Sequence, residues 1–265
     1  MSLAGEIREM LHEQIEYREL LFQMTLRDLL VRYKQTVMGF GWAVFMPIIN
    51  TAVFSVIFMR VTQLDTPAPY PLFAYCGFLM WNFFASSVRF SVSSLTNNAN
   101  LVQKVYFPRE IFPFAAVIVC LVDLVVGSVV LAALMVYYGY TVTPALLFLP
   151  IVVAVTVTFT TGVALILAMS NLFYRDVKYL FEVIVTAWML ATSVAYPVEG
   201  VGGWVGVLLR VNPMTQIIEA FRAVVLYGHL PATAPFLATA FASAVVLMVS
   251  WRLFHKAEFA FAENI

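Results

Sequence analysis

The segment Asn100-LVQKVYFPREIFP-Phe114 decides how this chain is organised. It is short, polar and basic, and it lies between two stretches that are long and apolar enough to cross a membrane. A loop between two spans ordinarily needs only turn residues. This segment instead has a helix-like body, a proline stop and an Arg-Glu pair directly before the next span. We interpret it as a segment that contacts a partner at the membrane surface.

The composition places the chain in the membrane class. Its 265 residues are 62% hydrophobic and 11% charged, whereas a soluble domain is about 45–50% apolar and about 25% charged. Lys+Arg and Asp+Glu number 15 each, so no excess charge predicts a nucleic-acid partner. Cys76 and Cys120 both lie in apolar runs, which predicts small buried side chains and neither a disulfide framework nor a metal site.

Six stretches approach the length of about 20 mostly apolar residues that a helical span needs. They are 39–59, 70–88, 115–138, 145–169, 179–197 and 234–254. The runs are continuous rather than alternating, which favours helices over a barrel. We therefore predict an all-α membrane protein with a six-span domain over residues 39–265. No apolar core of a signal peptide precedes Gly39, so we expect the first run to stay in place as a span.

The basic residues predict the orientation of these spans. With the N-terminus inside, 12 of the 15 Lys and Arg residues fall in cytoplasmic segments. Arg60, Arg210 and Arg222 remain outside. We expect both termini to be cytoplasmic and the protein to lie in a bacterial inner membrane.

Two further segments do not read as spans. Residues 1–38 place apolar side chains at near-helical spacing among charges, which predicts an amphipathic helix over 6–35 lying in the membrane interface. The alternative is a soluble cap packed on the bundle. Residues 198–233 are moderately apolar and broken by Gly and Pro. We predict two short re-entrant helices at the outer face, split near Asn212-Pro213, because such backbone at membrane depth must be buried in protein or line a cavity.

The sequence contains no P-loop and no HExxH, CxxC or GxSxG motif, so any energy for transport must come from another protein. The three histidines are scattered in polar segments and read as ordinary surface residues. Asp123 is near the middle of a span, where an acid costs about 2.5–3.5 kcal/mol. We expect it to face the bundle interior and either pair with another group or line a pore; a proton relay is the weaker alternative. Arg89 and Glu182 lie near span ends, where they can snorkel.

Several blocks, in this order and spacing, resemble the membrane subunit of type-2 ABC exporters of polysaccharides, the Wzm/TagG group. They run nearly from end to end of the chain: Arg27-DLLVRYKQTVMGFGWAVFMP-Ile48, Tyr70-PLFAYCGFLMWNFFASSV-Arg89, Asn98-ANLVQKVYFPREIFP-Phe114, Tyr174-RDVKYL-Phe181, Asn212-PMTQIIEAFR-Ala223 and Glu258-FAFAEN-Ile265. The first and third blocks carry most of the resemblance. It implies export of lipid-linked O-antigen or a similar glycan, such as teichoic acid, across the inner membrane.

The resemblance also implies a set of partners. Two copies of the chain would pair with two copies of a separate ATPase, which would bind ATP and Mg; this chain itself would hold no cofactor or metal and would not be an enzyme. Residues 98–110 would be the coupling loop that lies in a groove of the ATPase. Its contact residues would be Asn100, Leu101, Lys104, Val105, Phe107, Pro108, Arg109 and Glu110. The alternative for Lys104 and Arg109 is that they are simple cytoplasmic anchors.

We assign three further groups of residues. Arg175 and Asp176 would form a gate or second cytoplasmic contact. A polyprenyl-linked polysaccharide would place its lipid headgroup near Arg27, Arg32 and Lys34 in the interface helix. Aromatic faces cover sugar rings, which makes a set of aromatic residues candidates for the glycan path: Tyr75, Trp81, Phe84, Trp188, Tyr196 and Trp204. The competing classes are a type-2 ABC permease for a small lipid or drug, a proton-driven transporter, and a membrane enzyme acting on polyprenyl lipids.

Overall fold

A computed structural model describes residues 3–34, 36–39, 41–58, 66–104, 107–198, 201–258 and 261. All regular elements in these ranges are helical. They are α1 (Leu3–Glu16), α2 (Arg18–Tyr33), α3 (Gly41–Ile57), α4 (Tyr70–Asn97), α5 (Ala99–Lys104), α6 (Ile111–Tyr137), η2 (Pro144–Phe148), α7 (Leu149–Phe173), α8 (Val177–Leu190), α9 (Gly203–Val211), α10 (Pro213–Arg222), η3 (Ala223–Tyr227) and α11 (Thr233–Ala257).

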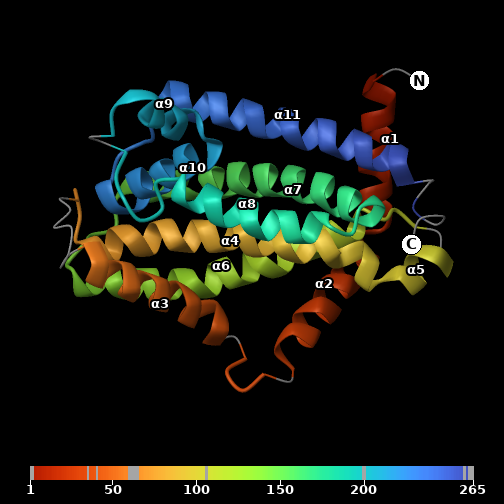
Figure 1. Cartoon of the computed structure of the whole chain (residues 1–265), viewed down its shortest axis with the longest axis horizontal. Helices are drawn as coiled ribbons and strands as arrows, with labels where there is room; N and C mark the ends of the chain where they lie inside the picture. Colours follow the sequence, from red (N-terminus) through yellow and green to blue (C-terminus); the bar gives the residue numbers. More distant parts are fainter. Residues whose placement is uncertain are drawn as a thin grey trace.

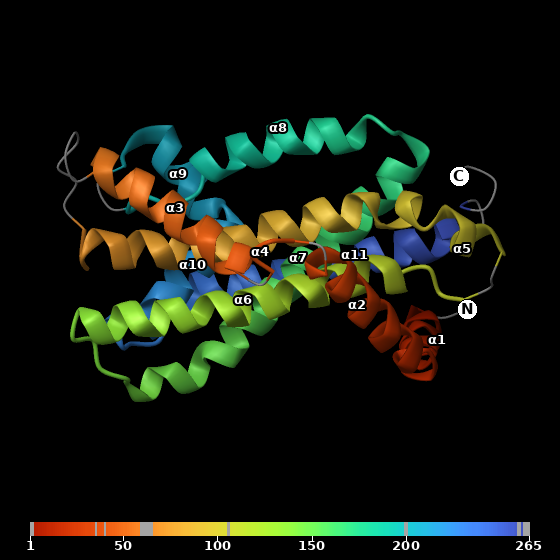
Figure 2. The same ribbon diagram turned by 90° about the horizontal axis from the view of Figure 1, so that it is seen from below.

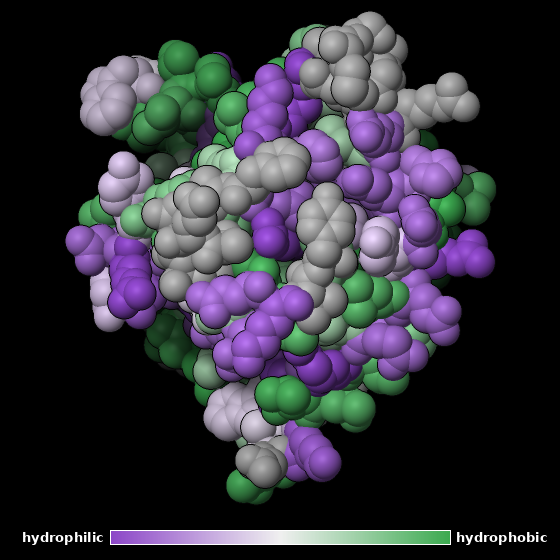
Figure 3. Space-filling view, turned by 90° about the vertical axis from the view of Figure 1, so that its right-hand side faces the viewer, coloured by the Kyte–Doolittle hydropathy of each residue, from purple (hydrophilic) through white to green (hydrophobic). Residues whose placement is uncertain are grey.

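Four helical segments are long and apolar enough to cross a membrane: α4, α6, η2 with α7, and α11. They run along the long axis of the molecule (Figure 1). The helices α1 and α5 and the C-terminal end of α11 lie at one end, and α9 lies at the other. Seen from the first end, hydrophilic side chains cover much of the face (Figure 3). The chain is therefore a multi-pass membrane protein with one polar end face.

The predicted count of six spans is supported only in part. The helix α3 is apolar but has 17 residues. The helix α8 has 14 residues, which is about 21 Å of helix and less than the roughly 30 Å of a bilayer core. The predicted fifth span, 179–197, ends as a helix at Leu190 and continues as turns. Two other boundaries also move outward, since α4 continues to Asn97 and α6 begins at Ile111.

The helix α4 is the centre of the bundle and packs against α3, α6 and α7. Most of its side chains are buried, including Phe73, Tyr75, Phe78 and Phe84. Tyr75 Oη donates a 2.9 Å hydrogen bond to the carbonyl of Gly127 in α6, which satisfies the polar end of a side chain inside an apolar core. The rings of Phe78, Tyr75 and Phe84 face different neighbours, α3, α6 and α7, so α4 is enclosed on several sides.

The N-terminal segment is two helices rather than the single amphipathic helix that we predicted. The chain turns at Tyr17 (φ −91°, ψ 16°), and α1 and α2 then run in different directions (Figure 1). Part of the α2 surface, at Leu20, Leu21 and Met24, packs against a second hydrophobic cluster of the bundle. The segment thus has the packing of a cap, and its position in the membrane interface stays a prediction.

Asn212 connects α9, α10 and the turn in which α8 ends. The split between two short helices falls at this residue, as predicted, with α9 before it and α10 after it. Its Oδ1 accepts from Met214 N and from Trp188 Nε1, each at 3.1 Å. Its Nδ2 donates to the carbonyl of Ala191 at 2.8 Å and to Thr192 Oγ1 at 2.9 Å. One amide therefore caps α10 and also binds the turn in which α8 ends. Whether these helices enter the membrane stays a prediction.

Arg222, which we counted among the outside charges, is fully buried, with 0% of its surface exposed. Its guanidinium donates to the carbonyls of Phe73, Ser193 and Val194 and lies 2.8 Å from Glu219 Oε1. It also stacks on the Phe73 ring, 3.5 Å from the ring centroid. The five N–H donors of arginine suit this site, because the turn after α8 leaves carbonyls without helical partners.

We predict that Gly77→Ala destabilises the protein through this site. A Cβ at Gly77 would lie 2.0 Å from the Val194 carbonyl oxygen and 2.6 Å from Arg222 Nη2. Overpacking of this kind costs about 1–3 kcal/mol or more. The apparent melting temperature in detergent should fall, and so should the amount of protein in the membrane. Gly202→Ala is the matched control, since no described atom lies within 4 Å of the added Cβ. Equal stability of the two variants would contradict this account.

Candidate coupling segment and transport surfaces

The predicted coupling loop, residues 98–110, contains a short helix, α5, followed by a turn that leads into α6. Pro108 lies in this turn, after the helix has ended. Val105 lies outside the described residues. The segment is at the polar end of the molecule, beside the C-terminal part of α11 (Figures 1 and 2). A helix-like body and a proline stop are both present.

Most of the predicted contact residues of this segment are buried within the chain itself. Phe107 is 4% exposed, Arg109 8% and Glu110 0%, and Pro108 is also buried. Phe107 packs edge-on to Phe112, with ring centroids 5.5 Å apart. In this arrangement Phe107, Arg109 and Glu110 offer little surface to a partner, and their role as contacts of an ATPase stays a prediction. These side chains fix the turn to the bundle.

Arg109 ties the turn to the C-terminal end of α11. Its backbone N–H donates to Glu258 Oε1 at 2.9 Å, and its guanidinium donates to the Glu258 carbonyl and, at 3.2 Å, to the Val102 carbonyl. Burial, reinforced by the neighbouring Glu110 carboxylate, raises the pKa of Glu258 to about 7. The tail after α11 and the turn before α6 thus form one polar cluster.

Glu110 extends this cluster. Its Oε1 accepts from Trp251 Nε1 at 3.1 Å and lies 3.7 Å from His255 Nδ1. Glu13 of α1 places a carboxylate oxygen in the same group, since the ligand atoms of Glu13, Glu110 and His255 all lie within 4.8 Å of one another. We read His255 as a surface residue; the structure instead places it beside three acids, Glu13, Glu110 and Glu258. The spacing Trp251, His255, Glu258 along one helix face is a signal that the sequence offered.

The exposed face of the coupling segment is small. It consists of Asn100, Gln103 and Lys104, with Leu101 half-buried beside them. Val102 is fully buried on the opposite side of α5. Only this face presents side chains outward from α5.

The C-terminal end of α2 reaches the middle of α6. Arg32 Nη1 lies 2.8 Å from Asp123 Oδ2, and Tyr33 Oη donates a hydrogen bond to Asp123 Oδ1. The guanidinium of Arg32 also stacks on Phe90, 4.2 Å from the ring centroid. Asp123 is thus paired with two groups from the N-terminal segment, which offsets the cost of an acid in a span.

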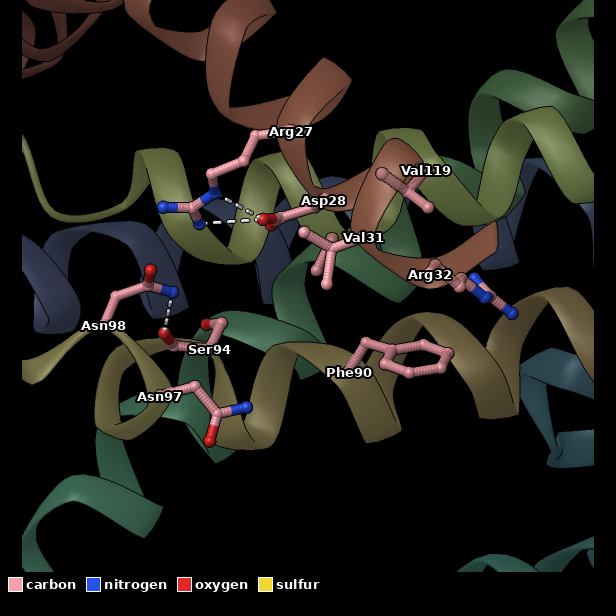
Figure 4. Close-up of a pocket in the computed structure, with 10 residues that line it drawn as sticks. Arg27, Asp28, Val31, Arg32, Phe90, Ser94, Asn97, Asn98 and Val119 are labelled. Atoms are coloured by element: carbon pink, nitrogen blue, oxygen red, sulfur yellow. Dashed lines mark hydrogen bonds and ion pairs between the residues drawn. The ribbon is translucent and has the colours of Figure 1, made fainter. Parts of the chain in front are cut away.

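The three predicted headgroup residues do not form one cluster. A pocket of about 370 Å³ lies between α2, α4 and α6. Arg27 and Arg32 lie at its opposite ends (Figure 4). Arg27 pairs with Asp28 at 2.7 Å, and Arg32 points away toward Asp123. Lys34 is exposed just beyond α2. The pocket wall on α4 is polar, with Ser94, Asn97 and Asn98.

The aromatic residues assigned to a glycan path are largely core residues. Tyr75, Trp81 and Phe84 are buried. Trp188 packs edge-on to Trp81 at 6.3 Å and to Phe84 at 5.1 Å between ring centroids. Tyr196 donates its hydroxyl to the Leu190 carbonyl, and Trp204 is exposed on α9. Packing leaves the three buried residues of α4 little free surface in this chain, and the role of the set as a glycan path stays a prediction.

Arg175 and Asp176 lie exposed in the turn between α7 and α8. Neither makes an ion pair with another residue that the structure describes. Arg175 lines a pocket of about 340 Å³ together with Lys178 and the end of α4. The role of Arg175 and Asp176 as a gate or second cytoplasmic contact stays a prediction.

The fold and these surfaces define a multi-pass membrane permease without a nucleotide-binding motif. The ABC-2 type transporter family model matches residues 19–226, and the chain belongs to this family. It is 30% identical over 258 residues to the O-antigen export system permease protein RfbA of Myxococcus xanthus, which covers 97% of this chain and 99% of that protein. Two Klebsiella pneumoniae proteins of the same name are 27% and 28% identical over 249 residues, covering 92% of this chain and 94% of each protein.

The raised pKa of Glu258 predicts a pH-dependent stability. The folded chain binds this proton more tightly than an unfolded chain, whose carboxyl group has the ordinary value of 4.5. Stability is therefore fully present below about pH 4.5 and falls as the pH rises toward 7 and above. The apparent melting temperature in detergent should drop between about pH 5 and pH 8, and Glu258→Gln should flatten this slope. An unchanged slope in the variant would show that other groups cause the pH dependence.

Proposed function

We propose that this chain is the membrane subunit of an ATP-driven exporter that moves lipid-linked polysaccharide of the O-antigen type from the cytoplasm across the inner membrane. The observation that carries the proposal is its similarity, over nearly its full length, to O-antigen export permeases. A family match alone would support only transport. The end-to-end coverage extends the similarity to the N-terminal helices and the C-terminal tail, which pack together at the polar end.

Energy would enter at the polar end of the molecule. An ABC-2 permease works with an ATPase, and this chain has no P-loop of its own. Two ATPase copies would bind ATP and Mg and contact the exposed face of α5. The buried cluster around Arg109, Glu110 and Glu258 supports force transfer, because it holds the turn rigidly to α11.

A second copy of this chain would complete the transport path. Large apolar side chains are exposed on α3 and α8, among them Trp42, Phe45 and Met46 on α3 and Val183 and Ile184 on α8. These faces would meet lipid or the second copy. Near the cytoplasmic side, Arg27, Arg32 and Lys34 would attract the lipid headgroup. Arg27 and Arg32 already pair with Asp28 and Asp123, so Lys34 would be the strongest attraction. Arg175 and Asp176 would form a contact that opens and closes with the ATPase.

Deletion of the gene tests the function directly. We expect long-chain polysaccharide to disappear from the cell surface while lipid-linked polymer accumulates inside, and a plasmid copy should reverse both effects. Gel analysis of surface glycan and extraction of the intracellular lipid-linked pool measure the outcome. Unchanged surface polysaccharide in the deletion strain would refute the proposal, and loss of a different exported molecule would favour a permease for a small lipid or drug.

Changing the charge on the exposed face of α5 tests whether this face docks the ATPase. The double variant Asn100→Asp/Lys104→Glu makes the exposed face of α5 more negative without touching the buried face. We expect co-purification with the ATPase to fall about tenfold, equivalent to about 1.4 kcal/mol.

The control for this test is Lys256→Glu, an exposed lysine at the end of α11. It should leave co-purification unchanged, and both variants should melt like the wild type. Full ATPase recovery with the double variant would exclude α5 as the docking site. Phe107→Asp is not a useful test, because Phe107 is buried and its replacement would disturb the fold.

A further inference from the structure

The helix α4 carries a polar stripe along one side toward its C-terminal end. Asn82, Ser86, Arg89, Ser93 and Asn97 recur at intervals of three or four residues, which places them on one side of a helix. The stripe covers 16 residues, and its first and last Cα atoms are about 22 Å apart along the helix axis. It starts at the cytoplasmic end of α4 and extends toward the middle of the bundle. Such a stripe in an apolar helix needs polar surroundings.

Three hollows follow this stripe and share residues. A pocket of about 350 Å³ between α3, α4 and α6 contains Asn82, Ser86 and Arg89. A second, of about 300 Å³, contains Arg89 and Ser93 and is closed on the other side by α8. A third, of about 340 Å³, contains Ser93 and Asn97 and reaches the turn between α7 and α8. Figure 2 shows α8 alongside α4 at one edge of the molecule. Because neighbouring pockets share Arg89 or Ser93, the three form one groove.

Both ends of this groove hold an amide group without a partner among the described residues. Asn82 Nδ2, a donor, has none in the first pocket. In the third pocket the acceptor Asn171 Oδ1 has none, although Asn171 is only 2% exposed. The Nδ2 of Asn171 donates to the Val92 carbonyl at 2.9 Å, which fixes the orientation of that amide. Each unpaired buried group costs about 1–3 kcal/mol. A ligand that both accepts and donates hydrogen bonds would satisfy both ends.

We propose that the groove along α4 is the binding path for the glycan of the transported molecule. Hydroxyl groups both donate and accept, so a sugar chain pairs with Asn82 and with Asn171. An acyl chain pairs with neither, and an anion would be repelled by the Asn171 acceptor. Arg175 and Lys178 make the cytoplasmic mouth positive. Beyond it, the hydroxyl and amide side chains of the stripe lie among apolar side chains and the charged groups of Arg89, Glu182 and Asp123. This inference rests on the proposed function and replaces the aromatic path with a polar one.

One ion pair crosses the groove. Arg89 of α4 makes two hydrogen bonds to the Glu182 carboxylate of α8, at 2.6 and 2.9 Å. The pair lies where the first and second pockets meet, since Arg89 lines both. The pair balances the charge of Arg89 and connects α8 to α4. A glycan that passes from the third pocket to the first must pass this pair, so movement of α8 sets the width of the path.

Bulky substitutions test the path. Ser86→Trp and Ser93→Trp fill the groove, and Val249→Trp places the same side chain on the exposed face of α11 as a control. We expect both groove variants to reduce surface polysaccharide about tenfold or more, because side chains that narrow a permeation path block it. ATPase co-purification and melting temperature should match those of the control. Stable groove variants that export like the wild type would overturn the proposal.

A second measurement reports binding without export and uses small substitutions. Ser86→Cys and Ser93→Cys can be labelled with a hydrophilic maleimide in the purified complex, since the native Cys76 and Cys120 are buried. We expect lipid-linked polysaccharide to slow labelling about threefold or more. The same lipid carrier without the glycan should leave the labelling rate unchanged. Equal protection by the bare lipid, or none by either, would overturn the glycan path. Failure of the gene-deletion experiment would instead refute the proposed function, so the two failures are distinguishable.

Discussion

The hydrogen bonds of the buried Arg222 guanidinium are the interaction on which the α9 and α10 end of the molecule depends. The helix α8 ends before it has crossed a bilayer, and the turn that follows leaves backbone carbonyls in an apolar environment. Arg222 satisfies two of them, at Ser193 and Val194, and a third at Phe73 of α4. Removal of one partner from such a buried charged site typically costs about 3–5 kcal/mol. The absence of a side chain at Gly77 follows from this arrangement, because a Cβ there would collide with the Val194 carbonyl and the Arg222 guanidinium.

Hydropathy predicted where the chain is helical but not which polar residues are buried. Continuous apolar runs located α4, α6, α7 and α11, because a span must satisfy its backbone within one helix. The same rule placed the end of α8 too far along the chain. Arg222, distant in sequence, binds the carbonyls that the shorter helix leaves unpaired. Arg109 and Glu110 were read as surface residues for a similar reason. Their partners, Glu258 and Trp251, lie about 140 residues further along the chain, and no local pattern connects them.

The aromatic and the polar residues of α4 are two alternative candidates for lining a transport path. The helix is rich in aromatic residues and also contains Asn82, Ser86, Ser93 and Asn97. Aromatic side chains suit both sugars and protein cores, so their presence alone does not separate the two uses. Polar side chains at regular spacing in an apolar helix have fewer explanations. The more informative signal was the spacing of the amides and hydroxyls, which the sequence contained.

The contact of Arg32 and Tyr33 with Asp123 has a mechanical consequence. Asp123 lies 12 residues after Ile111, where α6 begins, and this corresponds to about 18 Å of continuous helix. The turn that precedes α6 is fixed to the end of α11. If α6 slid along α2, the carboxylate would lose both partners in a medium of low dielectric constant. Displacement of the turn that precedes α6 therefore moves α6 and α2 together as one rigid body, and a molecule bound to the N-terminal segment would move with them.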